Sequence, residues 1–220
     1  DYIAAGRDLD TIPVNEFYAP SQIDFTHGGY ICVDGLYYAY LLVPSTGYKT
    51  QVPAGWLSLL VNAGDGIDMD LFLTRQPKDR MVRKLGQQLR INRSKIRETF
   101  DDLDGAIRSG YFLKDGLGNN EDFYYLNLLV TVTAENVEDL EWKVAELKKL
   151  MLSQDMDVQT CSFCQEQAFL SSMPLVSLER HLYERSKRNV LTTGAASCYP
   201  FTSYEMCDDS GILLGVNKHN

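Results

Sequence analysis

The hydrophobic pattern changes its period in the middle of the chain, which limits the folds that the chain can adopt. Over Ile67–Thr74, apolar and polar residues alternate, as is typical of a strand with one buried face. Over Lys78–Arg108, apolar residues recur at steps of three, four or seven, which predicts a long helix with a break near Arg90–Asn92. We expect Lys114–Asp122 to be the loop that follows. The chain therefore combines strands with helices.

Further strands are predicted on both sides of this region. Gly29–Val33 and Leu36–Val43 are expected to form a hairpin, because Asp34-Gly35 suits the positive φ angles of a type I′ turn. Apolar and polar residues largely alternate over Tyr124–Thr133, which predicts a half-buried strand. A shorter strand is predicted at Met156–Thr160.

Two helices are expected to connect these strands. One is short, at Ala54–Ala63; the other follows Asn136, which has the position of an N-cap. From Leu36 onward the order is strand, helix, strand, strand, helix, strand, which is the ferredoxin-like split βαβ plan. We therefore predict an α+β fold: a ferredoxin-like sheet with a long helical insertion at residues 78–115 and an extra amino-terminal hairpin strand.

The same pattern gives a prediction for the organisation of the chain. We expect an extended arm over residues 1–27, the α+β domain over 28–163, and a helical connecting segment over 164–209. Residues 210–220 read as the truncated first strand of a further domain. The chain starts at Asp1 without a signal-peptide pattern, which favours a segment of a cytoplasmic protein. Its longest apolar run, Leu36–Val43, is about half the length that spans a bilayer, so membrane association would be peripheral.

Charge is distributed unevenly along the chain. The net charge of -9 argues against generic nucleic-acid binding. Between residues 75 and 97, however, Asp79 is the single acid among nine cations: Arg75, Lys78, Arg80, Arg83, Lys84, Arg90, Arg93, Lys95 and Arg97. Such a cluster can contact anionic lipid, DNA or an acidic partner, or it can be the solvated face of an amphipathic helix. No aromatic residue lies among these cations, so stacking on nucleic-acid bases is not expected.

We select the predicted helix that carries these cations as the main candidate interaction surface. Its residues are Arg80, Arg83, Lys84, Arg90, Arg93 and Arg97. Tyr37 and Tyr38 of the first hairpin are added, because tyrosine is common at protein interfaces. The alternative for these two tyrosines is that they line the core of the sheet.

The cysteines offer one chemical alternative. Cys161-Ser-Phe-Cys164 precedes a predicted helix whose N-terminus could lower the pKa of one thiol, as in thioredoxin-like redox sites. The alternative is a pair of ordinary reduced cysteines, since the chain has five cysteines and is too large to need disulfides. A zinc site would require a second pair of ligands, which the spacing does not supply.

Two stretches resemble one protein family. Thr11–Val43, with the step Thr74-Arg-Gln-Pro77, and Asn189–Asn217, which reads NVLTTGAASCYPFTSYEMCDDSGILLGVN, are similar to the amino-terminal region of conjugative-transfer (type IV secretion) ATPases of Gram-positive mobile elements. The phosphate loop of that family, G-x-x-x-x-G-K-[ST], does not occur in this sequence. The resemblance therefore implies a non-catalytic domain, with ATP and Mg²⁺ bound elsewhere in the parent protein.

The resemblance also implies partners and a location. These are inner-membrane subunits of a secretion channel, the protein's own ATPase domain, and further copies in a homo-oligomer, at the cytoplasmic side of the membrane. We thus expect a docking and oligomerisation domain with no catalytic, cofactor or metal residue of its own, and without direct nucleic-acid binding. The alternatives are a stand-alone ferredoxin-like binding module and a thiol redox protein that uses Cys161 and Cys164.

Overall fold

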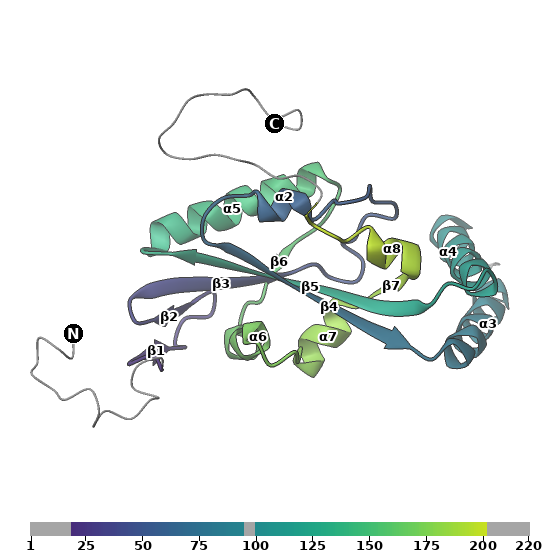
Figure 1. Ribbon diagram of the computed structural model, residues 1–220, viewed down its shortest axis with the longest axis horizontal. Helices are drawn as coiled ribbons and strands as arrows, with labels where there is room; N and C mark the ends of the chain where they lie inside the picture. Colours follow the sequence, from purple (N-terminus) through teal and green to yellow (C-terminus); the bar gives the residue numbers. More distant parts are fainter. Residues whose placement is uncertain (1–18, 95–99, 202–220) are drawn as a thin grey trace, which may run out of the picture.

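The computed structural model describes residues 19–94 and 100–201, which form one antiparallel sheet with helices on both faces (Figure 1). The seven strands are β1 (Ile23–Asp24), β2 (Ile31–Val33), β3 (Leu36–Leu42), β4 (Ile67–Gln76), β5 (Phe123–Ala134), β6 (Gln159–Thr160) and β7 (Arg188–Leu191). The helices are α2 (Ser58–Val61), α3 (Lys78–Ser94), α4 (Phe100–Gly118), α5 (Val137–Ser153), α6 (Gln165–Ser172), α7 (Arg180–Ser186) and α8 (Thr192–Ala196).

The sheet confirms the predicted α+β fold. Its central strands lie in the order β6-β3-β5-β4, and every pair is antiparallel. Because α2 connects β3 to β4 and α5 connects β5 to β6, this order corresponds to the split βαβ arrangement. The predicted N-cap of α5 is also present: the Asn136 side chain accepts a hydrogen bond from the Asp139 backbone N–H at 2.8 Å.

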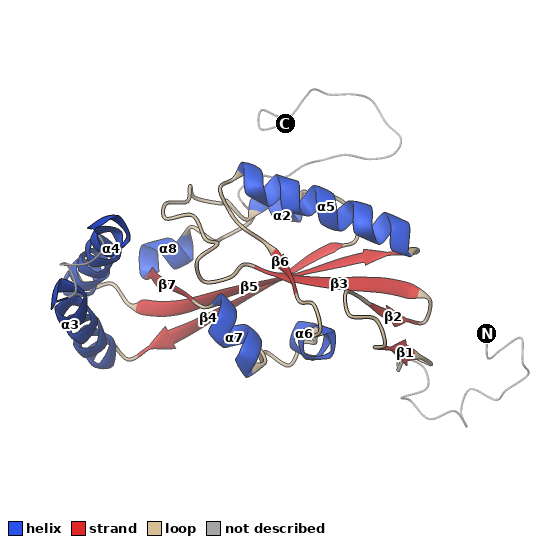
Figure 2. Ribbon diagram, turned by 180° about the vertical axis from the view of Figure 1, so that it is seen from behind, coloured by secondary structure: helices blue, strands red, loops and turns tan. Residues whose placement is uncertain are grey.

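Both faces of the sheet are covered. Helices α2 and α5 lie on one face, and α6 and α7 lie on the other (Figures 1 and 2). Strand β5 has buried residues on both faces; Val130 packs in the α5 core and Leu129 in the α6–α7 core. The prediction of a half-buried strand is therefore wrong for β5, and burial on both faces explains why it has so many consecutive apolar residues.

The helical insertion lies at one end of the sheet. Helices α3 and α4 pack side by side between the end of β4 and the start of β5 (Figure 1). They are joined to the sheet by a third apolar cluster, which includes Met81, Leu85, Leu117, Phe123 and Leu191. The insertion is therefore anchored to the domain through its own small core.

Several boundaries differ from the sequence-based expectations. Helix α4 continues to Gly118, so the first half of the predicted loop Lys114–Asp122 is helical. A Cβ on Gly116 would lie 2.2 Å from Leu191 Cδ1, so this glycine permits close packing of α4 on β7. Helix α3 runs without a break to Ser94. Helix α2 starts only at Ser58, because the chain before it turns at Gly55, which has a positive φ of 72°.

The carboxyl-terminal part also differs from the prediction. Residues 164–209 were expected to be helical, yet they include strand β7, which pairs with residues 123–126 of β5. Strand β3 pairs with residues 129–134 of the same strand, so β7 extends the line of β3 along one edge of β5. The predicted strand Met156–Thr160 is reduced to β6, and the predicted arm contains the short strand β1. Residues 210–220 lie outside the described part of the chain.

Candidate interaction surface

The outer side of α3 carries the predicted basic residues. Met81, Leu85 and Leu89 are spaced by four and are buried, so they define the inner side of the helix. The cations fall on the remaining positions and are exposed: Arg80, Arg83, Lys84, Arg90 and Arg93. We call these five residues the basic face. Arg97 lies outside the described residues.

Most arginines of the basic face are ordered by contacts within the insertion. Arg83 Nε and Arg90 Nε donate to the carbonyl oxygens of Asp79 and Gly86, each at 3.3 Å. The Arg93 guanidinium lies 5.2 Å from the centroid of the Tyr111 ring, within the range of a cation–π contact. Among the residues that the structure describes, no member of the basic face forms an ion pair with a carboxylate.

Lys84 differs from the other members because it connects α3 to the sheet. Its Nζ donates to Tyr125 Oη at 3.1 Å and lies 5.7 Å from the Tyr125 ring centroid. Lys187, at the end of α7, approaches the same ring to 5.6 Å and the Tyr183 ring to 5.8 Å. Lys84 and Lys187 thus hold α3, β5 and α7 together at this corner of the fold.

Glu184 provides the nearby negative charge. Its carboxylate accepts a hydrogen bond from Lys187, and this bond lowers the pKa of Glu184, with Arg180 and Lys84 acting in the same direction. Lys187, Tyr125 and Glu184 were not predicted from the sequence to be neighbours of the basic face. Nothing in their spacing signals the contact, because it depends on how α7 packs on the sheet.

Tyr37 and Tyr38 lie far from the basic face. They are consecutive residues of β3, so their side chains point to opposite faces of the sheet, and both are half-buried. Tyr37 pairs with Ala134 at the end of β5, whereas the insertion packs at Phe123, where β5 starts. At about 3.3 Å per residue, β5 separates the two regions by roughly 35 Å. The structure does not bring the tyrosines and the basic face together.

The two cysteines of the C-x-x-C sequence are in different environments. Cys161 is fully buried, and burial raises the pKa of its thiol to about 12. Cys164 is half-buried at the N-cap of α6, and its backbone N–H donates to the Cys161 carbonyl oxygen at 3.1 Å. A nucleophilic thiol requires a lowered pKa. The environment of Cys161 therefore opposes thiolate formation.

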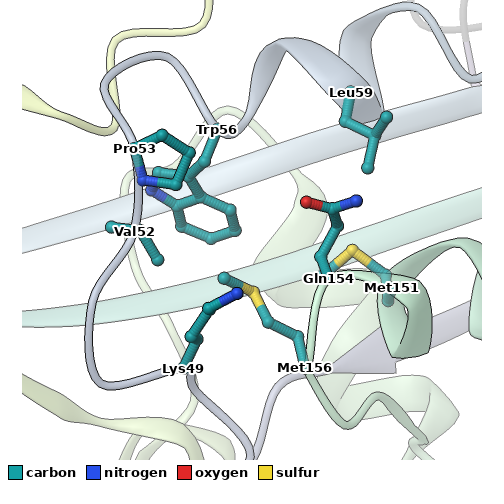
Figure 3. Close-up of a pocket in the computed structure, with 8 residues that line it drawn as sticks. All are labelled: Lys49, Val52, Pro53, Trp56, Leu59, Met151, Gln154 and Met156. Atoms are coloured by element: carbon teal, nitrogen blue, oxygen red, sulfur yellow. The ribbon is translucent and has the colours of Figure 1, made fainter.

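A small apolar pocket lies on the α5 side of the sheet. Figure 3 shows it between the segment that leads into α2 and the chain at the end of α5. Its lining residues are Lys49, Val52, Pro53, Trp56, Leu59, Met151, Gln154 and Met156. Lys49 is the one ionisable group among them, and its Nζ forms an ion pair with Asp155 at 2.9 Å. This lining offers no acid–base pair for catalysis.

Among the residues whose side chains the structure describes, 19–93 and 105–201, no three His, Cys, Asp or Glu side chains gather in a way that could hold a metal ion. In the part of the chain that the structure describes, none of the helices combines the length and the apolar character needed to cross a membrane.

No protein-family model matches the sequence, and no curated protein is significantly similar to it.

Proposed function

We propose that this chain is the non-catalytic amino-terminal docking and oligomerisation domain of a conjugation (type IV secretion) ATPase that energises DNA or protein transfer. The proposal rests on the resemblance of Thr11–Val43 and Asn189–Asn217 to that family. In this account ATP and Mg²⁺ bind to the parent protein beyond this chain. The domain itself binds other proteins, at the cytoplasmic side of the membrane.

The basic face is the observation that supports docking most strongly. It projects at one end of the sheet, on an insertion that the split βαβ arrangement does not require (Figure 1). Its cations lack carboxylate partners among the described residues, although the chain as a whole has a net charge of -9. A surface of this kind attracts an acidic partner and repels further basic surfaces. Inner-membrane subunits of the secretion channel with acidic cytoplasmic segments are the partners that we propose.

Direct binding of nucleic acid is not part of the proposal. The ring of Tyr111, which is 39% exposed, already contacts the Arg93 guanidinium at 5.2 Å from its centroid. A single-strand binding surface would instead present several open rings for base stacking. The basic face therefore suits carboxylates better than bases.

The docking proposal is tested by reversing charge on the basic face. Arg83→Glu combined with Arg90→Glu changes two exposed arginines without removing Lys84, which holds α3 to β5. Lys114→Glu combined with Lys149→Glu is the matched control, because both lysines are exposed and lie on α4 and α5. Binding is measured by sedimentation with membrane vesicles from cells that contain the secretion channel and from cells that lack it.

We expect the arginine variant to lose binding to channel-containing vesicles by about tenfold, as when attractive charge pairs become repulsive. The lysine variant should bind nearly as well as the unchanged chain. Equal binding of the unchanged chain to both kinds of vesicle would show that lipid, and not a channel subunit, is the ligand. Unchanged binding of the arginine variant would contradict the role of the basic face.

A further inference from the structure

Strand β4 has one side that no other strand covers, which we call the open edge. Its ten residues pair with β5 in unbroken register, and among the described residues no strand pairs with its other side. The strands β1 and β6, at the opposite side of the sheet, have only two residues each. A long edge strand presents a row of backbone N–H and C=O groups to which another strand can pair.

Two hydrogen bonds show which residues of β4 direct their backbone groups to the open edge. The Thr133 N–H donates to the carbonyl oxygen of Gly66, directly before β4, at 2.7 Å. The Leu128 N–H points away from β4 and donates to Tyr48 Oη at 3.1 Å. Hydrogen-bonded and non-hydrogen-bonded pairs alternate in an antiparallel ladder, so every second residue of β4 directs its backbone groups away from β5. These residues are Ile67, Met69, Leu71, Leu73 and Arg75.

The side chains at the open edge leave both cores of the domain incompletely covered. Ile67, Met69 and Leu71 pack against the α5 core and Phe72 against the α6–α7 core, and all four are only partly buried. Leu73 is 42% exposed. The strand contains neither proline nor lysine, and no bulge interrupts its pairing with β5. The open edge therefore lacks several of the features that commonly prevent strand pairing.

The two aspartates of β4 restrict how a second copy can pair with this edge. A twofold axis perpendicular to the sheet keeps each side chain on its own face, so the axis passes through the position of one residue. A register centred on Asp70 would place two like charges opposite each other, which is destabilising. The pKa of Asp70 is already raised, by burial and by the charge of Asp68. A register centred on Leu71 would place Asp70 opposite Phe72.

A register centred on Phe72 avoids these conflicts. It places Asp70 opposite Thr74 of the second copy and Asp68 opposite Gln76, so each carboxylate faces an uncharged polar side chain. Phe72 then faces Phe72 of the second copy in a non-hydrogen-bonded pair, the kind in which side chains approach most closely.

The other face of the sheet matches in the same register. Leu71 of each copy lies opposite Leu73 of the other, and such apolar cross-strand pairs stabilise a sheet. Arg75, whose charge is balanced by an ion pair with Asp122 at 2.9 Å, lies opposite Met69. These four pairs would form about eight backbone hydrogen bonds between the copies.

We propose that two copies of this chain join through antiparallel pairing of β4, with Phe72 on the twofold axis, to form one continuous sheet. A second copy is the partner because the strand is complementary to itself in this register, in charge, in apolar side chains and in backbone groups. Such a contact covers both open edges and adds no further copy. The inference rests on the oligomerisation part of the proposed function. It requires neither the basic face nor an ATPase domain, so it can fail while docking holds.

Sedimentation equilibrium of the full chain over a range of concentrations tests the dimer. We expect a mass that rises with concentration from 24.9 kDa to twice that value. Leu73→Lys should weaken the dimer by at least about tenfold, because a lysine on an edge strand opposes pairing. Leu152→Lys is the matched control, since Leu152 on α5 is 68% exposed and lies outside β4. A chain that stays monomeric at its highest soluble concentration, or a dimer that Leu73→Lys leaves unchanged, would overturn the proposal.

A disulfide test examines the register and does not depend on the lysine variant. Phe72→Cys places two thiols opposite each other, where the Cα atoms of a non-hydrogen-bonded pair lie about 4.5 Å apart. Thr74→Cys is the control, because four residue steps, roughly 13 Å, would separate the two cysteines. Under mild oxidation we expect the intermolecular disulfide at position 72 to form at least about tenfold faster, and mass spectrometry identifies the linked peptides. Equal rates from both positions, or no disulfide at position 72, would contradict the pairing.

Discussion

Lys84 Nζ of α3 donates a hydrogen bond to Tyr125 Oη of β5 at 3.1 Å, across 41 positions of sequence. This bond connects the helical insertion to the strand that runs through the middle of the sheet. The same hydroxyl lies 3.8 Å from the Met81 sulfur, and the ring of Tyr125 is 8% exposed. A buried tyrosine thus links the surface that we propose for docking to the core of the domain.

Tyr125→Phe should lower the free energy of unfolding by about 1 kcal/mol, the usual net worth of one hydrogen bond in a protein. The ring contacts of Tyr125 with Lys84 and Lys187 remain in this variant, so the change isolates the hydroxyl. Urea unfolding monitored by circular dichroism measures the difference. Tyr124→Phe is the control, because the hydroxyl of Tyr124 makes no hydrogen bond within the described residues. If both substitutions lower the free energy of unfolding equally, the hydrogen bond between Lys84 and Tyr125 does not stabilise the domain.

Gly116→Ala should destabilise the domain by about 1–3 kcal/mol, although alanine is normally the better helix former. The added methyl group would lie 2.2 Å from Leu191 Cδ1, so Leu191 or α4 has to move. Gly86→Ala is the matched control, since a Cβ at that position of α3 meets nothing within 4 Å. Thermal unfolding should rank the variants as Gly86→Ala at or above the parent chain and Gly116→Ala below it. The reverse order would contradict the packing of α4 on β7.

Asn136→Ala should cost about 1 kcal/mol, since it removes the side-chain acceptor for the Asp139 N–H at the start of α5. Glu135→Ala, one residue earlier and also exposed, should have little effect. Hydrogen exchange at the first turn of α5 gives a local measure of the same bond. Unchanged exchange in Asn136→Ala would show that the cap contributes nothing.

Cys161 should react slowly with iodoacetamide at pH 8, because burial raises the pKa of its thiol from 9.0 to about 12. Cys164, which is half-buried, should be alkylated first. Mass spectrometry of the native chain after timed labelling distinguishes the two. Rapid labelling of Cys161 near neutral pH would instead support the thiol redox alternative.

The raised pKa of Cys161 also predicts the direction of a stability change. Between pH 9 and about pH 12 the unfolded thiol loses its proton while the folded thiol keeps it. Unfolding then releases a proton, so the free energy of unfolding falls as pH rises through this range. Cys161→Ala should reduce the steepness of that fall. An unchanged slope would assign the alkaline loss of stability to other groups, such as Tyr40, whose pKa burial also raises to about 12.

Sequence patterns predicted the central elements because the causes are local. Alternation identified β4 and β5, and the capping position of Asn136 identified the start of α5. The helical spacing of Val82, Leu85 and Leu89 likewise predicted α3, although Met81, and not Val82, is the buried residue of its first turn. In each case the residues that produce the pattern lie within a few turns or strand steps of one another.

Tertiary contacts determine what the sequence did not predict. The glycines near residue 116 were interpreted as signs of a loop. Gly116 lies instead within α4, where a glycine is required because Leu191 leaves no room for a side chain. Strand β7 has only four residues and forms on the part of β5 that β3 leaves open. The distance between Tyr37 and the basic face depends on which ends of the sheet carry them. The contact between Lys187 and Tyr125 arises in the same way, from elements that meet only in the folded chain.

The most direct test of the central proposal is the sequence of the parent reading frame beyond Asn220. We predict a strand pair followed, within roughly fifty residues, by a phosphate loop of the form G-x-x-x-x-G-K-[ST], since this motif defines the nucleotide-binding domain of the proposed ATPase. A stop codon directly after Asn220, or an unrelated domain, would contradict the ATPase assignment and leave an α+β interaction module with a basic face.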